Sequence, residues 1–166
     1  MKKLLLAILF VGSASATCLA QANQGSKFNI GVEAGLPVGS THDLYNSVIG
    51  GSIKYELSVA SSTFLTLSAG YNSFHSTDDY QAVGAKSSVG FVPLKAGLKY
   101  YFNEGFFGEG QLGVAINTVK DGGSAFAYSP GIGYSFDGGL EAGVRYEGWS
   151  KGGTISQVGL RVGYRF

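Results

Sequence analysis

The sequence is poor in the residues that build most soluble enzymes and disulfide-stabilised domains. Of its 166 residues only one is a cysteine, and only 14% are charged, below the roughly 25% of a typical soluble domain. The lone cysteine, Cys18, lies near the N-terminus, so a disulfide framework and a cysteine-ligated metal site are excluded. The 12 Lys and Arg nearly balance the 11 Asp and Glu, and this balance gives no indication of a nucleic-acid partner.

Apolar runs long enough for a membrane-spanning helix are also missing. The most prominent run, residues 4–11, follows Lys2 and Lys3 and is too short to span a bilayer as a helix. A basic start, a short apolar segment and the small residues around Ala22 predict a cleaved secretory signal peptide, residues 1–22. The mature domain, residues 23–166, then carries no thiol and contains ten basic and eleven acidic residues.

What the sequence has in abundance is glycine, aromatic residues and strict alternation. From Val158 to Phe166, apolar side chains occupy every even position, and glycine or arginine occupies every odd position. A period of two is typical of a β-strand whose two faces meet different environments. The same alternation recurs in seven earlier segments, residues 28–36, 49–59, 65–71, 92–102, 106–116, 126–136 and 140–146.

The connections between these segments alternate in length. Short ones lie at residues 60–62, 103–105 and 137–138, and longer ones at residues 37–48, 73–88, 118–124 and 148–153. Transmembrane barrels have short periplasmic turns and longer outer loops. The sequence therefore predicts an all-β fold, an eight-stranded antiparallel up-and-down transmembrane β-barrel whose last strand pairs with its first. Pro130, inside the sixth segment, predicts a β-bulge there.

The charged residues of the strands all lie on the polar parity. A basic side chain at the bilayer midplane costs about 2–4 kcal/mol, so the polar parity is expected to face the lumen. The lumen of a barrel of about eight strands is just wide enough for side chains to fill it. We predict a lumen ion-pair network, with glycines leaving room for its long side chains, and a narrow water-filled path is the alternative. The predicted network comprises Lys27, Glu33, Lys54, Glu56, Lys95, Lys99, Glu109, Glu141, Arg145, Glu147, Arg161 and Arg165.

The aromatic residues of the apolar parity gather near the strand ends. Tyr71, Phe126, Tyr128 and Tyr146 lie near the long connections, and aliphatic residues and glycine lie between the two groups. Aromatic rings favour the headgroup level of a membrane, so two girdles around an aliphatic band indicate a lipid-facing surface. The girdle predicted at the short-turn end comprises Phe28, Tyr55, Tyr100, Phe102, Phe106, Tyr134 and Phe136.

Three segments carry a resemblance to a known family: residues 92–102, residues 126–134, and the terminal Tyr164-Arg165-Phe166. The mature chain resembles the small eight-stranded outer-membrane barrels of Gram-negative bacteria, the OmpA-transmembrane and OmpX-like class. The resemblance implies a place in the outer membrane. It also implies a C-terminal assembly signal at Tyr164 and Phe166, which the barrel assembly machinery recognises. Arg161 departs from that signal, which often has glycine there. A shared fold does not fix an activity.

The sequence favours a structural or surface-interaction role, with outer loops that face an unidentified extracellular ligand. We expect a monomer in outer-membrane lipid, without catalytic residues, a cofactor or a metal. A narrow passive pore is the first alternative and a lipid A-modifying enzyme the second. The enzyme alternative depends on His42 beside Asp43 and on His75 near Asp78 and Asp79, which could also hold a divalent cation. A lone loop histidine near aspartates is usually just solvated, so we assign no such site.

Overall fold

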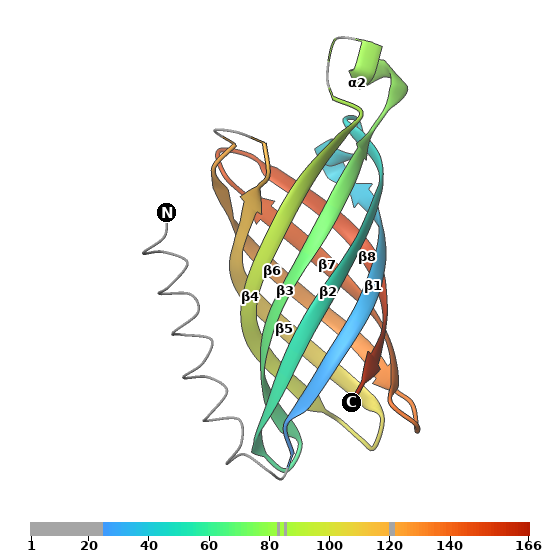
Figure 1. Ribbon diagram of the computed structural model, residues 1–166, viewed down its shortest axis with the longest axis vertical. Coiled ribbons are helices and arrows are strands. Elements are labelled where there is room, and N and C mark those ends of the chain that lie inside the picture. Colours follow the sequence, from blue (N-terminus) through green and yellow to red (C-terminus); the bar gives the residue numbers. More distant parts are fainter. Residues whose placement is uncertain (1–24, 83, 85, 120–121) are drawn as a thin grey trace, which may run out of the picture.

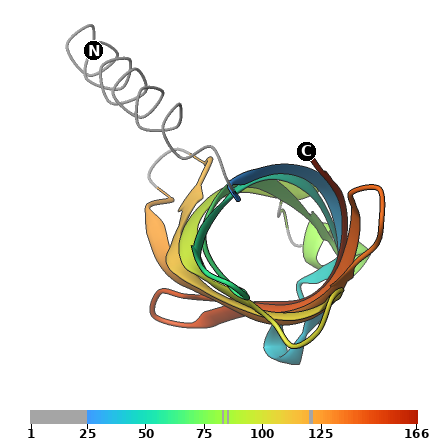
Figure 2. The same cartoon turned by 90° about the horizontal axis from the view of Figure 1, so that it is seen from below.

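The computed structural model describes residues 25–82, 84, 86–119 and 122–166, and the predicted signal peptide lies outside them. Eight antiparallel strands form a closed barrel in which each strand pairs with its neighbours in the chain (Figure 1). Seen along its axis, the backbone forms a complete ring (Figure 2). The predicted fold class is confirmed. No helix in the described part of the chain is long and apolar enough to cross a membrane.

Two short helices, η1 (Gly39–Thr41) and α2 (Asp78–Ala82), lie in the longer connections, and α2 stands at the barrel end opposite the C-terminus (Figure 1). We call the end with the longer connections the outer end and the other the turn end. The strands are β1 (Lys27–Val38), β2 (Tyr45–Ala60), β3 (Thr63–Ser76), β4 (Ser88–Tyr101), β5 (Phe106–Asn117), β6 (Ser124–Ser135), β7 (Leu140–Ser150) and β8 (Thr154–Arg165).

Several strands extend farther toward the outer end than the sequence predicts. Residues 45–48, 73–76 and 148–150, expected in loops, continue β2, β3 and β7. The alternation is lost there because large apolar side chains such as Phe74 and Trp149 take inward positions, where polar residues were expected. The outer loops are correspondingly shorter than expected.

Closure of the barrel depends on the pairing of β1 with β8. The register runs from Asn29 opposite Arg165 to Val38 opposite Ser156, and the Phe166 amide donates to the Phe28 carbonyl at 2.8 Å. An unpaired backbone group in lipid costs several kcal/mol. The pairing removes both sheet edges at once, as predicted for the first and last strands.

The outer face of the sheet is apolar and the inner face is polar, which is the opposite of the arrangement in a soluble protein. Leu112 is 59% exposed and Val32 68%, whereas Lys99 and Glu56 are 0% exposed. Apolar side chains on the outer surface require an apolar solvent, because soluble monomers rarely expose continuous apolar patches. The lipid-facing surface is therefore the one that the apolar parity predicts.

Pro130 does not produce the expected bulge. The β6–β7 register passes from Tyr128 opposite Gly148 to Gly131 opposite Arg145 without a shift, although Ser129 and Pro130 have no partner on that side. The same occurs at Pro93, where the β3–β4 pairing skips two residues in register. Proline lacks the amide hydrogen, so it removes a ladder bond without adding a residue to the strand.

The face assignment predicts the effect of a charge at Leu112, near the middle of β5. Leu112→Arg should lower the free energy of unfolding in lipid vesicles by about 2–4 kcal/mol, since the guanidinium enters the hydrocarbon region. Leu112→Phe, which changes size without adding charge, is the control and should stay near wild type. Urea titration in vesicles measures both variants. Equal losses in the two would contradict a lipid-facing position.

Candidate functional site

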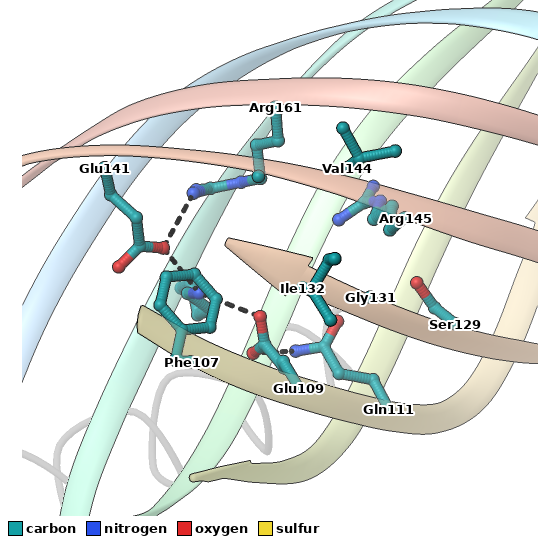
Figure 3. Close-up of a pocket in the computed structure, with 12 residues that line it drawn as sticks. Phe107, Glu109, Gln111, Ser129, Gly131, Ile132, Glu141, Val144, Arg145 and Arg161 are labelled. Carbon is teal, nitrogen blue, oxygen red and sulfur yellow. Dashed lines mark hydrogen bonds and ion pairs between the residues drawn. The ribbon is translucent and has the colours of Figure 1, made fainter. Parts of the chain in front are cut away.

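The turn-end half of the lumen contains a compact cluster of buried ion pairs. Lys54 Nζ lies 3.0 Å from Glu109, 3.0 Å from Glu141 and 3.2 Å from Glu56. Lys99 Nζ lies 3.0 Å from Glu56 and also contacts Glu141 directly. Figure 3 shows Glu109, Glu141 and Arg161 directed into the same space. The two lysines and three glutamates come from β2, β4, β5 and β7 and Arg161 comes from β8, so the cluster connects strands on opposite sides of the barrel.

A second cluster lies nearer the outer end. Lys95 Nζ lies 2.8 Å from Glu147, and Arg145 pairs with both Glu147, at 2.9 Å, and Glu33. Arg161 connects the two clusters, because its guanidinium lies 3.5 Å from Glu33 and 3.7 Å from Glu141. The two clusters thus form one lumen network.

Glycines leave the space that Arg161 occupies. A Cβ on Gly31 would lie 2.7 Å from the Arg161 guanidinium carbon, and a Cβ on Gly163 would lie 2.8 Å from Nη1. The guanidinium also donates to Asn29 at 2.7 Å and to Ser52 at 3.0 Å. Both glycines pair across β1–β8, so the closing seam is shaped around this side chain.

The lumen network is electrically balanced. Burying a charge is costly unless it is paired and hydrogen-bonded, and the five cations of the network meet five carboxylates. Lys27 and Arg165, predicted in the same network, make no ion pair among the described residues. Lys27 lies 5.9 Å from the Phe64 ring centroid, and Arg165 donates to the Tyr101 hydroxyl at 2.7 Å. Both are partly exposed at the turn end, where water solvates their charges.

Toward the outer end, an aromatic cluster fills the lumen above the ions. Tyr45, Phe74, Phe91 and Trp149 form this outer aromatic layer, with ring centroids 5.4 Å (Tyr45–Phe74), 5.0 Å (Phe74–Trp149) and 4.7 Å (Phe91–Trp149) apart. The Trp149 indole donates to Glu147 at 3.0 Å and so joins the layer to the lumen network. The alternation pattern does not predict this layer. Phe74 and Trp149 continue the inward parity of Asn72 and Glu147, which is the signal that could have revealed it.

Aromatic rings also close the turn end. Tyr101 lies between Phe64 and Phe107, each at a ring-centroid distance of 5.6 Å, and Phe107 is only 4% exposed. Lys99 Nζ lies 4.0 Å from the Phe107 ring centroid, within the range of a cation–π interaction. This inner aromatic layer therefore contacts the lumen network from the opposite side.

Small cavities lie between these layers in the described part of the lumen. One of about 30 Å³ is lined by Ser129, Gln111, Glu109, Arg145 and their neighbours (Figure 3), and another of about 10 Å³ lies beside Glu33 and Asn72. The Ser129 hydroxyl lines the larger cavity and has no hydrogen-bond partner among the described residues. A water needs about 10–15 Å³, so such spaces accommodate isolated waters.

The residues predicted for the turn-end girdle all project outward. Phe102 is 60% exposed and Tyr100 50%, and their rings meet at 5.4 Å. Tyr164 and Phe166 form a similar exposed pair at 5.0 Å. The remaining members of the predicted turn-end girdle are Phe28, Tyr55, Phe106, Tyr134 and Phe136.

Neither histidine forms a hydrogen bond or ion pair with a carboxylate in the part of the chain that the structure describes. His75 lies in β3 opposite Ser47 and Ser88, and its buried Nδ1 has no hydrogen-bond partner among the described residues. His42 follows η1 at an exposed position. Within the described ranges, no three His, Cys, Asp or Glu side chains lie close enough to hold a metal ion.

Comparison with known families decides what kind of barrel this is. A family model described as "Outer membrane protein beta-barrel domain" matches residues 4–166. The chain belongs to this family. Its place is therefore the outer membrane.

Solved structures share this fold at low sequence identity. Ail, the attachment invasion locus protein of Yersinia pestis, is 17% identical with a TM-score of 0.60, over 85% of this chain and 97% of that one. The outer membrane enzyme PagL is 16% identical with a TM-score of 0.64, over 82% and 98%. The designed barrel TMB2.3 is 21% identical with a TM-score of 0.59, over 87% and 98%. No curated protein matches the chain. An attachment protein, an enzyme and a design share this fold, so the likeness carries no activity.

The lumen network predicts a large effect at Glu141, which contacts Lys54, Lys99 and Arg161. Glu141→Gln should lower the free energy of unfolding by about 3–5 kcal/mol, because it leaves buried cations undercompensated. Adding Lys99→Met should recover part of that loss. Urea titration in vesicles measures the double-mutant cycle.

Glu104→Gln is the matched control for this cycle, because Glu104 is exposed in a turn. It should change stability by less than about 0.5 kcal/mol. If the effects at Glu141 and Lys99 simply add, the two side chains are not energetically coupled, contrary to the described contact.

Proposed function

We propose that this protein is a closed structural barrel of the outer membrane, whose rigid wall presents the outer loops for surface interaction. The observation that carries the proposal is the continuous filling of the lumen. The inner aromatic layer, the lumen network and the outer aromatic layer follow one another along the axis, and consecutive layers are in contact. Side chains at each level of the axis narrow the path that a solute would take, and this supports a closed barrel over an open pore.

The pore alternative requires a connected aqueous path. The cavities of about 30 and 10 Å³ between the layers are too small for a hydrated ion to pass. Opening a path would require Lys54, Lys95 and Lys99 to leave buried carboxylates. Separating a buried ion pair costs several kcal/mol, so the filled state should dominate.

Planar-bilayer recording tests this proposal directly. Purified protein should give no stepwise conductance in bilayers where a large general porin, used as the positive control, does. The variant Trp149→Ala should stay closed as well, because the lumen network and the inner aromatic layer remain. Regular ohmic conductance steps from the wild-type protein would contradict the proposal of a closed barrel and support the narrow pore instead.

We also propose a non-enzymatic role. Hydrolytic chemistry needs a nucleophile and a base within hydrogen-bond reach, and a third group that orients the base. Among the described residues, no hydrogen bond or ion pair joins His42 or His75 to a serine hydroxyl or to a carboxylate. Similarity to PagL is a likeness of fold at 16% identity and supplies no active-site residue here.

The outer loops constrain the kind of ligand. Ail has been solved in complex with the heparin analogue sucrose octasulfate, a polyanion. The described outer loops of this chain carry Asp43, Asp78 and Asp79 against Lys86 and Lys151. Recognition of a polyanion needs clustered cations, so this charge pattern favours a different ligand class.

The proposed partner during biogenesis is the barrel assembly machinery, which recognises the exposed pair Tyr164 and Phe166 on β8. The proposed mature form is a monomer, supported by the pairing of all eight strands, which leaves no free sheet edge.

The assembly role is separable from the girdle role by a matched pair of variants. Tyr164→Ala/Phe166→Ala should sharply reduce the amount of protein in the outer membrane. Tyr100→Ala/Phe102→Ala, which removes a similar exposed ring pair at the same barrel end, should reduce it much less. Immunoblots of membrane fractions measure both, and refolding in detergent checks that each variant folds. If both double variants lowered the amount of protein in the outer membrane equally, Tyr164 and Phe166 would act only as girdle residues and not as an assembly signal.

A further inference from the structure

A cup of about 340 Å³ opens at the outer end of the barrel. Its rim comes from three outer connections, through Ser40, Leu44, Gly122 and Lys151, and its floor consists of Phe91, Ala115 and Trp149. We call this space the outer cup. It is far larger than the cavities inside the lumen, and its volume lies within the range of small-molecule sites, roughly 300–1,000 Å³.

The floor of the outer cup is preformed. Phe91 and Trp149 are 5% and 2% exposed and pack on each other and on Phe74. The bond from the Trp149 indole to Glu147 fixes the ring orientation. A ligand that settles on this floor does not have to order it, which removes one cost of binding.

The wall of the outer cup is apolar, although it lies on the lumen side of the barrel. Ala125 and Ile155 pack against the outer aromatic layer, and Leu44 is 37% exposed at the rim. These residues line a space at the mouth of the lumen, not the outside of the barrel wall. An apolar concavity that faces water favours a ligand with an apolar body.

The described residues that line the outer cup carry charge of one sign. Among the described residues that line it, Lys151 is the ionised one, and the lining holds no carboxylate. The Lys151 ammonium donates to the Gly122 carbonyl at 2.9 Å, which uses one of its three hydrogens. Asn117, Ser124 and Thr154 add neutral polar groups. The complementary ligand therefore carries one anionic group.

We propose that the outer cup binds a small amphiphilic monoanion, with its apolar ring or chain on Phe91 and Trp149 and its carboxylate, sulfonate or sulfate group at Lys151. The inference rests on the proposed surface role, and it names the ligand class for that role. The inference does not depend on whether the lumen conducts. Bilayer recording therefore tests the closed barrel, and ligand binding tests the outer cup, independently of each other.

Trp149 makes the test specific, because it is the single tryptophan of the sequence and lies in the floor of the cup. The probe is 4-bromobenzenesulfonate, whose bromine quenches indole fluorescence on contact, titrated onto the protein in lipid nanodiscs. The expected result is saturable quenching. The uncharged 4-bromobenzyl alcohol should bind more weakly, and the 4-bromobenzylammonium cation more weakly still.

Three variants locate the binding. Lys151→Met should weaken sulfonate binding by about threefold, as expected for an exposed charge pair, and leave the neutral probe unaffected. Lys86→Met removes the same charge from another outer loop and should bind like wild type. Ala125→Phe should fill the cup and abolish saturable quenching, with folding checked by the mobility of unheated samples in gels.

Quenching that rises linearly without saturation would overturn the proposal. So would equal binding of the anionic and cationic probes, or an Ala125→Phe variant that is folded and still binds like wild type.

Discussion

The constraint on which the structure depends is that lipid offers no hydrogen bonds to a backbone. Every strand must pair on both sides, so β1 and β8 have to meet and the sheet has to close. Closure with eight strands fixes a narrow lumen, and the alternation of side chains then directs half of each strand into it. The buried charges, the glycines around Arg161 and the aromatic layers all follow from the need to fill that space.

The kind of side chain that fills the lumen changes along the barrel axis with the surroundings at each depth. Near the middle, where the charged groups are buried, Lys54 and Lys99 are neutralised by Glu56, Glu109 and Glu141. At the turn end, where the lumen meets water, Lys27 and Arg165 need no carboxylate. Toward the outer end, rings replace ions, and the rings are linked to the ions by the indole of Trp149. Each level thus satisfies its polar groups with the partners available there.

The fold could be predicted from the sequence because period-two alternation indicates both where a strand runs and which side chains lie on each of its faces. Leu112 and Lys99 were placed on the correct sides by parity alone. The outer aromatic layer could not be predicted in the same way, since Phe74 and Trp149 on a polar parity resemble the end of a strand. The bulge expected at Pro130 was wrong because a lost hydrogen bond does not force an extra residue. The pairing of Glu33 with Arg145, 112 residues apart, requires the barrel register, which sequence spacing does not provide.

The long reach of the lumen contacts has a consequence for folding. Arg161 bonds to Asn29 across 132 residues, and Lys54 bonds to Glu141 across 87. Such high contact order means that several interior charges, among them Glu33 and Arg161, find their partners only after the last strands arrive. A barrel that lacks β7 and β8 holds Lys54 and Lys99 without Glu141, and Glu33 without either arginine. The polar interior thus penalises incomplete intermediates and makes insertion and closure a single cooperative event.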